Sequence, residues 1–277
     1  MNVLLHTIAL EPARWLPERV SQPLPDMLPS IAHAGFRHLE IYEPHLAASK
    51  DLEALKASLI ANRLAPVILS SYLRLNPAQT TDAGLDADIE KAADLVECFG
   101  FQKLRVFPGL GMRPDDSAGV AIFLERLRRL AARLPETEIL LETHDSSLAD
   151  DPALIVRIVE DAGLPKLGLL FQPLKFTDPA HAMRQFMLQK KHVRHLHLQN
   201  RDAEMALVRI GAGLIPWSEI LTQLDAGVGA SIEFVPAGMR PVETFRRDEA
   251  IREAAEDAET VRSWCCGRSM TPEARDA

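Results

Sequence analysis

Short apolar runs alternate with amphipathic segments along almost the whole chain. Eight apolar runs have the length and composition of buried strands, and their starts lie about 27 to 37 residues apart, as a strand, a helix and two loops require. These runs cover residues 3–10, 36–42, 65–73, 101–107, 137–143, 166–172, 193–199 and 230–235. Helical patterns follow them at residues 26–35, 51–64, 86–100, 117–134, 151–163, 178–189, 216–227 and 241–264. This alternation predicts an α/β protein with a parallel sheet. Eight such units predict a single (β/α)₈ TIM barrel, with an open doubly wound sheet as the alternative.

Some helix ends are marked by their residue types. Asp151 is expected to cap a helix that has Pro152 at its first position and Gly163 as its stop. Asp86 is expected to cap the helix that follows it.

No shift of composition divides the chain into domains. We assign residues 1–264 to the barrel, and we expect residues 265–277, which lack periodicity, to form a C-terminal tail. Residues 10–25 contain four prolines and are expected to form a loop over the mouth of the barrel. Residues 201–214 are expected to form a second long loop.

Composition limits the classes of partner. Hydrophobic residues make up 47% of the 277 residues and charged residues 25%, which is typical of a globular protein. The net charge of −8 offers no basic face, so we expect no nucleic acid partner. No stretch reaches the roughly 20 apolar residues that span a membrane, and the N-terminal segment lacks the basic region of a signal peptide. Cys98, Cys265 and Cys266 form no framework of disulfide pairs, which favours a cytoplasmic location.

Polar residues recur on one face of the predicted strands. Successive side chains of a strand point to opposite faces, and the active sites of barrels form at the C-terminal strand ends. The residues that share this face are His6, His38, Glu40, Arg105, Glu142, His144, Gln172, His195, His197, Gln199 and Glu233. Single residues such as His6 and His38 are interpreted as polar side chains that fill the lumen. His195 lies two residues deeper than His197, so we expect it to be hydrogen-bonded and not to bind a metal.

Glu142 and Glu233 are harder to explain as filling. Two carboxylates that point into one lumen require a cation, a proton or an arginine nearby. Together with His197, they predict a polar centre at the mouth of the barrel.

Five motifs add a resemblance to this pattern. GFRHLEIY, ILLETH, HLHLQN, GAGLIPWSEIL and SIEF follow one another from the second predicted strand to the eighth. Their order and spacing resemble the xylose isomerase-like TIM-barrel superfamily of sugar (phosphate) isomerases and epimerases, over about residues 3–264. In that family a divalent metal is typically held by Glu, Asp, His and Glu at the ends of strands five to eight. The resemblance places these ligands at Glu142, Gln172, His197 and Glu233.

The chain departs from the family pattern at two of its strands. The sixth-strand Asp is Gln172, and the histidine three residues later is Lys175. The seventh-strand His-x-Lys-Asp is His197-Leu198-Gln199-Asn200. An amide oxygen binds a hard cation without adding charge, so the resemblance implies a Mn, Mg, Co or Zn site of reduced affinity. We expect Gln172 to turn its amide oxygen to a bound metal; otherwise we expect the ammonium of Lys175 to lie between Glu142 and Glu233.

The resemblance implies an isomerase or epimerase that acts on a small sugar or polyol, either free or phosphorylated. Glu142 and Glu233 would transfer protons through an enediolate with the help of the metal. The candidates for binding the substrate are Glu40, Arg105, His144, Lys175 and Arg201. Two alternatives remain open: a polyol dehydratase or lyase on the same barrel, and a non-catalytic ligand-binding relative with a degraded metal site. We expect a small-molecule partner, and a homodimer as the commonest assembly of such chains.

Overall fold

Eight parallel strands close into a barrel in the computed structural model, which describes residues 1–16, 20–225 and 227–266. The strands are β1 (Val3–His6), β2 (His38–Tyr42), β3 (Ala65–Ser70), β4 (Lys103–Val106), β5 (Glu138–Glu142), β6 (Leu167–Phe171), β7 (Val193–Leu198) and β10 (Gly229–Ile232). Around the barrel they follow the order β1-β10-β7-β6-β5-β4-β3-β2. Each of the eight predicted strands is therefore confirmed, and the alternative of an open sheet is wrong.

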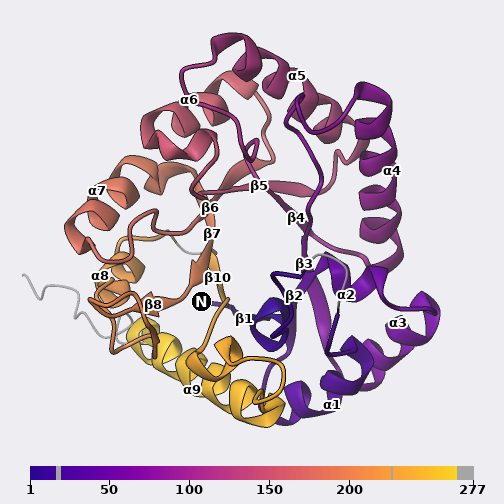
Figure 1. Ribbon diagram of the computed structural model, residues 1–277, viewed down its shortest axis with the longest axis vertical. Helices are drawn as coiled ribbons and strands as arrows, with labels where there is room; N and C mark the ends of the chain where they lie inside the picture. Colours follow the sequence, from indigo (N-terminus) through magenta and orange to yellow (C-terminus); the bar gives the residue numbers. More distant parts are fainter. Residues whose placement is uncertain (17–19, 226, 267–277) are drawn as a thin grey trace, which may run out of the picture.

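Helices surround the strands on the outside (Figure 1). The α-helices are α1 (Leu24–His33), α2 (Glu43–Ala47), α3 (Leu52–Ala61), α4 (Asp82–Phe99), α5 (Ser117–Arg133), α6 (Pro152–Ala162), α7 (Pro179–Gln189), α8 (Trp217–Thr222) and α9 (Arg247–Cys266). The 3₁₀ helices are η1 (Thr7–Leu10), η2 (Leu148–Asp150), η3 (Lys190–His192) and η4 (Pro236–Met239). Among the helices of the described residues, none is long and apolar enough to cross a membrane.

The predicted helix ends are confirmed in α6 and wrong in α4. The Asp151 side chain accepts hydrogen bonds from two backbone N–H groups of the first turn of α6, and Gly163 ends that helix with a left-handed φ of 66°. Helix α4 begins before Asp86, because the Thr81 hydroxyl accepts a hydrogen bond from the N–H of Gly84 and caps it there. A threonine hydroxyl serves as a cap in the same way as an aspartate.

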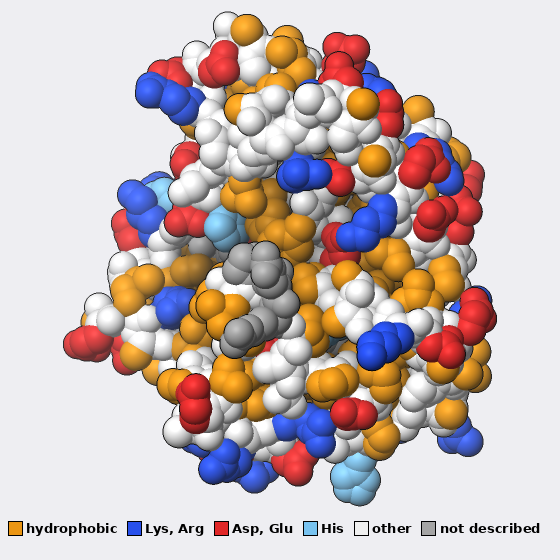
Figure 2. Space-filling model, turned by 45° about the vertical axis from the view of Figure 1, so that its right-hand side comes forward, with side chains coloured by type: hydrophobic (Ala, Val, Ile, Leu, Met, Phe, Trp, Pro, Cys, Tyr) orange, Lys and Arg blue, Asp and Glu red, His pale blue; other side chains and the backbone are white. Residues whose placement is uncertain are grey.

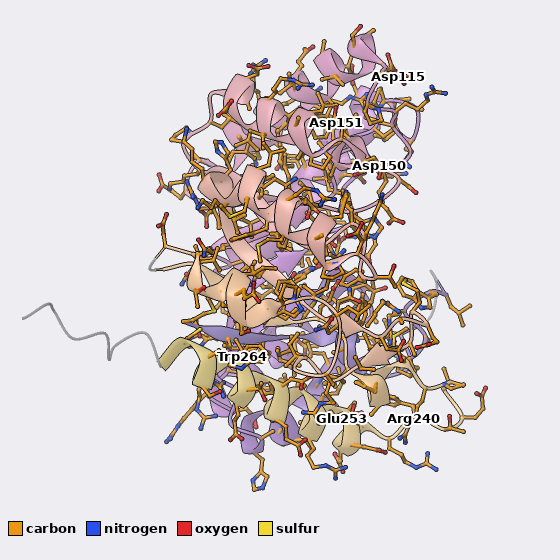
Figure 3. The ribbon with its side chains drawn as sticks, turned by 90° about the vertical axis from the view of Figure 1, so that its left-hand side faces the viewer. Asp115, Asp150, Asp151, Arg240, Glu253 and Trp264 are labelled. Carbon is orange, nitrogen blue, oxygen red and sulfur yellow. The ribbon has the colours of Figure 1, made fainter. Side chains whose placement is uncertain are left out.

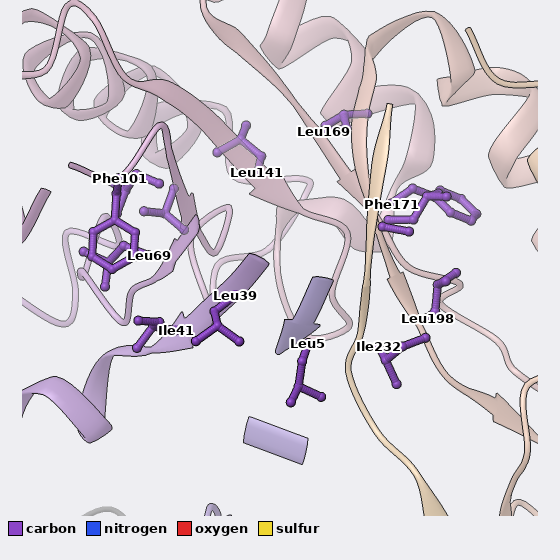
Figure 4. Close-up of a cluster of buried hydrophobic side chains, with 14 of the residues drawn as sticks. Leu5, Leu39, Ile41, Leu69, Phe101, Leu141, Leu169, Phe171, Leu198 and Ile232 are labelled. Atoms are coloured by element: carbon purple, nitrogen blue, oxygen red, sulfur yellow. The ribbon is translucent and has the colours of Figure 1, made fainter. Parts of the chain in front are cut away.

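The hydrophobic core has two parts, as the alternation along the strands predicts. A large cluster lies between the strands and the helices, and Figure 4 shows members of it on neighbouring strands, among them Leu5, Leu141 and Leu169. A small cluster on the other face of the strands contains Leu4, Ile68, Leu140 and Leu170. Each of these four residues stands two positions before a polar residue at a strand end: His6, Ser70, Glu142 and Gln172. The lumen is therefore apolar below and polar at its mouth.

A short hairpin follows β7, where the sequence predicted only a loop. Its strands β8 (Asn200–Arg201) and β9 (Leu207–Val208) pair antiparallel. The Asn200 side chain fixes the next segment, because it donates to the carbonyl oxygens of Ile210 (2.8 Å) and Ile215 (3.1 Å) and accepts from the N–H of Ile215 (3.0 Å). The hairpin and the segment that follows it are thus held together.

Helix α9 runs along the barrel beside its first and last strands. Its buried face carries Ala250, Ala254, Ala258 and Val261. In Figure 3, Trp264 near the end of α9 and Arg240 before its start lie on opposite sides of the lower part of the molecule. The expected tail begins inside this helix at residue 265, and its residues 267–277 lie outside the described residues.

Candidate active site

The polar residues at the strand ends meet in the lumen because the register of the sheet aligns them. His6 on β1 pairs with Glu40 on β2, and Ser231 on β10 pairs with His197 on β7. His6, Glu40 and His197 are completely buried, and Glu142 and Glu233 are exposed by only 2% and 5%. The charges of the three glutamates are therefore shielded from water. Interactions between charges in such a buried place are stronger than at the protein surface.

His197 is at the centre of this cluster. Its Nε2 lies 2.9 Å from Glu40 Oε1, and its Nδ1 lies 3.2 Å from Glu233 Oε1 and 3.6 Å from Glu142 Oε1. Burial alone would lower the pKa of His197, but Glu40, Glu233 and Glu142 together raise it well above its usual value. Burial alone would raise the pKa of Glu40, but the contact with His197 holds it well below its usual value.

Glu142 is anchored by a guanidinium group. Arg105 Nε lies 3.0 Å from Glu142 Oε2, and the Arg105 guanidinium also donates to the Ser71 carbonyl oxygen and the Ser70 hydroxyl. Burial raises the pKa of Glu142, but Arg105 and His197 outweigh burial and lower it to about 2. Glu142 therefore stays charged over the physiological range of pH.

Two glutamine side chains connect the two carboxylates. Gln172 Nε2 donates to Glu142 Oε1 (3.2 Å), and Gln199 Nε2 donates to Gln172 Oε1 (3.0 Å) and to Glu233 Oε2 (2.8 Å). Arg201 donates to Gln199 Oε1 at 3.2 Å. Because arginine only donates and a carboxylate only accepts, this series of hydrogen bonds from Arg201 to the two glutamates has a single self-consistent direction.

Two further histidines lie in the lumen, and burial lowers the pKa of each to about 3. His195 bonds the Ser231 hydroxyl through Nε2 at 2.7 Å, as expected for a hydrogen-bonded lumen residue. Neither ring nitrogen of His6 has a hydrogen-bond partner among the described residues. Both imidazoles are therefore neutral at physiological pH.

A cavity of about 650 Å³ opens above these groups. Its floor contains Arg105, Glu142, Gln172, Gln199 and Glu233. Aromatic side chains form much of its wall: Trp15, Tyr72, Phe107, Phe176 and Phe234. Figure 2 shows hydrophobic side chains gathered in the middle of one face of the molecule, with charged side chains around them. A cavity with an apolar wall and a few convergent polar groups is typical of a small-molecule site.

The structure brings Glu142, Gln172, His197 and Glu233 together, as the sequence predicted. Among the candidates for binding the substrate, Arg105, His144, Lys175 and Arg201 line the cavity. Glu40 does not line it, because this residue lies fully buried against His197 Nε2.

The expected position of Lys175 between the two glutamates is wrong. Lys175 is exposed at the rim, and among the described residues no ion pair joins it to Glu142 or Glu233. Arg105 and His197 supply the positive charge instead. The hydrogen bond between Gln199 and Gln172 was not predicted, although the alternation of the strand places Gln199 on the lumen face.

Comparison with known proteins decides the family. The sequence profile of the xylose isomerase-like TIM barrel family matches residues 28–263. The chain belongs to the xylose isomerase-like TIM barrel family. Comparison with curated protein sequences gives no significant match.

Solved structures of this family share the fold at low identity. The probable 3-DHS dehydratase AsbF from Bacillus anthracis is 17% identical with a TM-score of 0.73, over 94% of this chain and 99% of that one. The IOLI protein with a bound zinc atom is 15% identical with a TM-score of 0.73, over 95% and 99% of the two chains. A D-allulose 3-epimerase from Methylomonas sp. is 16% identical with a TM-score of 0.66, over 94% and 98%. Proteins named for different reactions thus share this barrel fold.

The residues of this xylose isomerase-like barrel fit a divalent ion. Two ligand atoms that bind one ion, each about 2.1 Å from it, lie about 3 to 4 Å apart. His197 Nδ1 lies within this range of Glu233 Oε1 (3.2 Å) and Glu142 Oε1 (3.6 Å). Glu40 holds the other ring nitrogen of His197, which is how carboxylates orient histidines that bind metals. His6, His197 and Glu233 also form a group whose ligand atoms lie within 4.8 Å of one another. Gln172 fits less well, because its amide oxygen faces Gln199.

Proposed function

We propose that this protein is a metal-assisted isomerase or epimerase of a small sugar or polyol, which moves a proton at a carbon next to a hydroxyl or carbonyl group. The observation that carries the proposal is the convergence of the Glu142 and Glu233 carboxylates on one nitrogen of His197 at the floor of the cavity. A divalent ion held by His197, Glu233 and Glu142 would supply positive charge that acidifies the carbon-bound proton between two substrate oxygens.

Glu233 is the better candidate for the base. It lies at the floor of the cavity, and its only ion-pair partner among the described residues is His197. Gln199 donates to Glu233 Oε2, which leaves Oε1 on the side of His197. A carboxylate in this position is able to take a proton from a bound carbon acid and return it to a neighbouring atom through an enediolate.

Glu142 differs from Glu233 in its surroundings. With a pKa lowered to about 2 by Arg105 and His197 against the effect of burial, it is a weak base. We infer that Glu142 mainly orients the substrate and balances positive charge. In an epimerization, Glu142 would also have to donate a proton to the opposite face of the substrate. It would then have to be protonated first, which requires a weaker ion pair with Arg105.

Recognition of the substrate is assigned to the cavity wall. Arg105 lies at the floor, while Lys175, Arg201 and His144 lie around the cavity with donors for hydroxyl or anionic groups. Arg201 is already tied to Gln199 Oε1 and to the Met205 carbonyl oxygen, so its guanidinium is fixed in place.

Exchange of carbon-bound hydrogen with solvent tests this proposal. Purified protein loaded with Mn²⁺ is incubated in D₂O with a panel of pentoses, hexoses, their phosphates and cyclic polyols, and deuterium incorporation is followed by NMR. We expect exchange in at least one compound, a loss of about 10²–10⁴-fold in Glu233→Gln, and a smaller loss in Glu142→Gln. The metal content of each variant is measured in parallel, so that loss of the ion is separated from loss of the base. A fully metal-loaded wild type that exchanges no compound of the panel would favour the non-catalytic relative.

A dehydratase is the second candidate, because the structure leaves one carboxylate better placed than the other. An elimination needs a single base to remove the proton, and Glu233 is sufficient for that step. A structural neighbour is described as a probable 3-DHS dehydratase. The same NMR experiment separates the two reactions, because an elimination gives a product that has lost water.

A further inference from the structure

His6 is a buried residue that the proton transfer described above does not use. Its side chain is completely buried, and both ring nitrogens lack a hydrogen-bond partner among the described residues. The nearest acidic atom paired with it, Glu40 Oε1, is 3.9 Å from Nδ1, which is beyond hydrogen-bond distance. Buried polar groups are nearly always satisfied, and leaving one unpaired destabilises the fold. His6 therefore carries two unmet donor or acceptor positions at the centre of the protein.

The position of His6 places it beside the candidate metal ligands. It ends β1, which pairs with β10, and β10 in turn pairs with β7, the strand of His197. The rings of His6 and His197 stack with their centroids 5.1 Å apart. A nitrogen of His6 lies within 4.8 Å of the ligand atoms of both His197 and Glu233. Two ligands of one ion are about 3 to 4 Å apart, so binding of one ion by all three would draw their ligand atoms closer and turn the stacked ring of His6 toward the ion.

The other side of the site is occupied by bonds within the protein. The amide oxygen of Gln172 accepts from Gln199, and its amide nitrogen faces Glu142. Glu142 itself is bound to Arg105 at 3.0 Å. Both nitrogens of His6 on β1 are therefore without a hydrogen bond, as is His197 Nδ1, whereas the Gln172 amide is already hydrogen-bonded and Glu142 is paired with Arg105.

We propose that His6 is a ligand of the metal ion, together with His197 and Glu233, in the place that Gln172 does not fill. The inference rests on the proposed function only in requiring that an ion is bound. Two imidazoles in place of one give the site a preference for metals that accept nitrogen ligands, such as Zn²⁺, Co²⁺ and Mn²⁺, over Mg²⁺.

The test compares two buried histidines of the same lumen. His6→Phe removes both nitrogens and keeps a ring, and His6→Leu provides a smaller replacement. His195→Gln is the matched control, because it removes an imidazole from the lumen but retains a donor for Ser231. Affinity for Co²⁺ and Mn²⁺ is measured by calorimetry on the full chain, and pulsed EPR of the Mn²⁺-loaded protein counts coordinated imidazole nitrogens.

We expect two coordinated imidazoles in the wild type and one in His6→Phe, with affinity at least about 10-fold lower in both His6 variants. His195→Gln should bind as the wild type does. The metal-free His6→Phe and His6→Leu proteins should unfold at the same or higher denaturant concentration, because two unpaired polar atoms have been removed.

Three results would overturn the inference. Wild-type affinity in both His6 variants would show that His6 is no ligand and would leave the proposed function intact. A single imidazole in the EPR of the wild type would do the same. A wild type that binds neither ion would remove this inference and the metal of the proposed function together.

Discussion

At the scale of single residues, the site is a balance of buried charges. Glu40, Glu142 and Glu233 lie close to Arg105 and to His197, whose pKa they raise well above its usual value. A buried ion pair adds little stability compared with an apolar pair, but removing one partner leaves the other charge without compensation. The cations of this floor are therefore structural as well as functional.

Arg105→Met is expected to show this dependence. The change leaves Glu142 buried without its guanidinium partner, and the free energy of unfolding should fall by about 3–5 kcal/mol. Adding Glu142→Gln to Arg105→Met should recover a large part of the loss, because the uncompensated charge is removed. Urea unfolding of the wild type, both single variants and the double variant gives the coupling energy. Losses that simply add in the double variant would contradict the expected coupling.

Alternation along the strands was sufficient to predict the face of Glu142, His197 and Glu233, and this face is the lumen in the structure. It could not predict which lumen residues touch, because contacts across a barrel depend on tilt, register and side-chain length. Gln199 and Gln172 come from different strands, and only their packed geometry shows that they bond each other. For the same reason the sequence could not show that both ring nitrogens of His6 lack a hydrogen-bond partner among the described residues.

At the scale of elements, the strands were easier to predict than the ends of the helices. The buried strands are continuous apolar runs, whereas the start of a helix depends on which of several hydroxyl or carboxylate side chains reaches its N–H groups. Helix α9 begins at Arg247 and not at residue 241, and the hairpin of β8 and β9 has only two residues in each strand. Such short strands leave no recognisable period in a sequence.

The hairpin provides a prediction at this scale. A Cβ on Gly213 would collide with the side chain of Asn200, which holds the segment after the hairpin. Gly213→Ala should therefore lower the free energy of unfolding by about 1–3 kcal/mol and weaken ligand binding, because Arg201 is displaced with the hairpin. Gly211→Ala is the matched control, since the nearest atom to its Cβ is 3.7 Å away.

The comparison is made by chemical denaturation, with Mn²⁺ affinity as the second measurement. Equal stability of the two alanine variants would mean that Asn200 is able to move without loss, and that the hairpin is not fixed from this side.

At the scale of the whole molecule, α9 packs against β1 and β10, the pair of strands that joins the two ends of the barrel. Ala250, Ala254 and Ala258 of this helix are completely buried, so its axis approaches the strands closely. Ala254→Leu is expected to lower the free energy of unfolding by about 1–3 kcal/mol, because the added atoms have no space.

Glu259→Leu on the exposed side of the same helix is the control and should change stability by less than about 0.5 kcal/mol. Thermal unfolding followed by circular dichroism measures both variants. A stable Ala254→Leu protein would show that α9 is able to shift outward while the barrel stays closed.

The pairing of β1 with β10 also determines when the site can exist during synthesis. Val3 pairs with Ala230, so the two strands that carry His6 and lead to Glu233 are separated by most of the chain. The N-terminus of a chain leaves the ribosome first, and contacts between residues this distant in sequence form late. A nascent chain whose β10 is still to be synthesised or is still inside the ribosome has no closed lumen, and Glu233 is absent from its site. If the proposed site binds a metal, the complete ligand set is therefore available only in a chain that includes β10 and Glu233, and translation products that end before β10 should not compete for the ion.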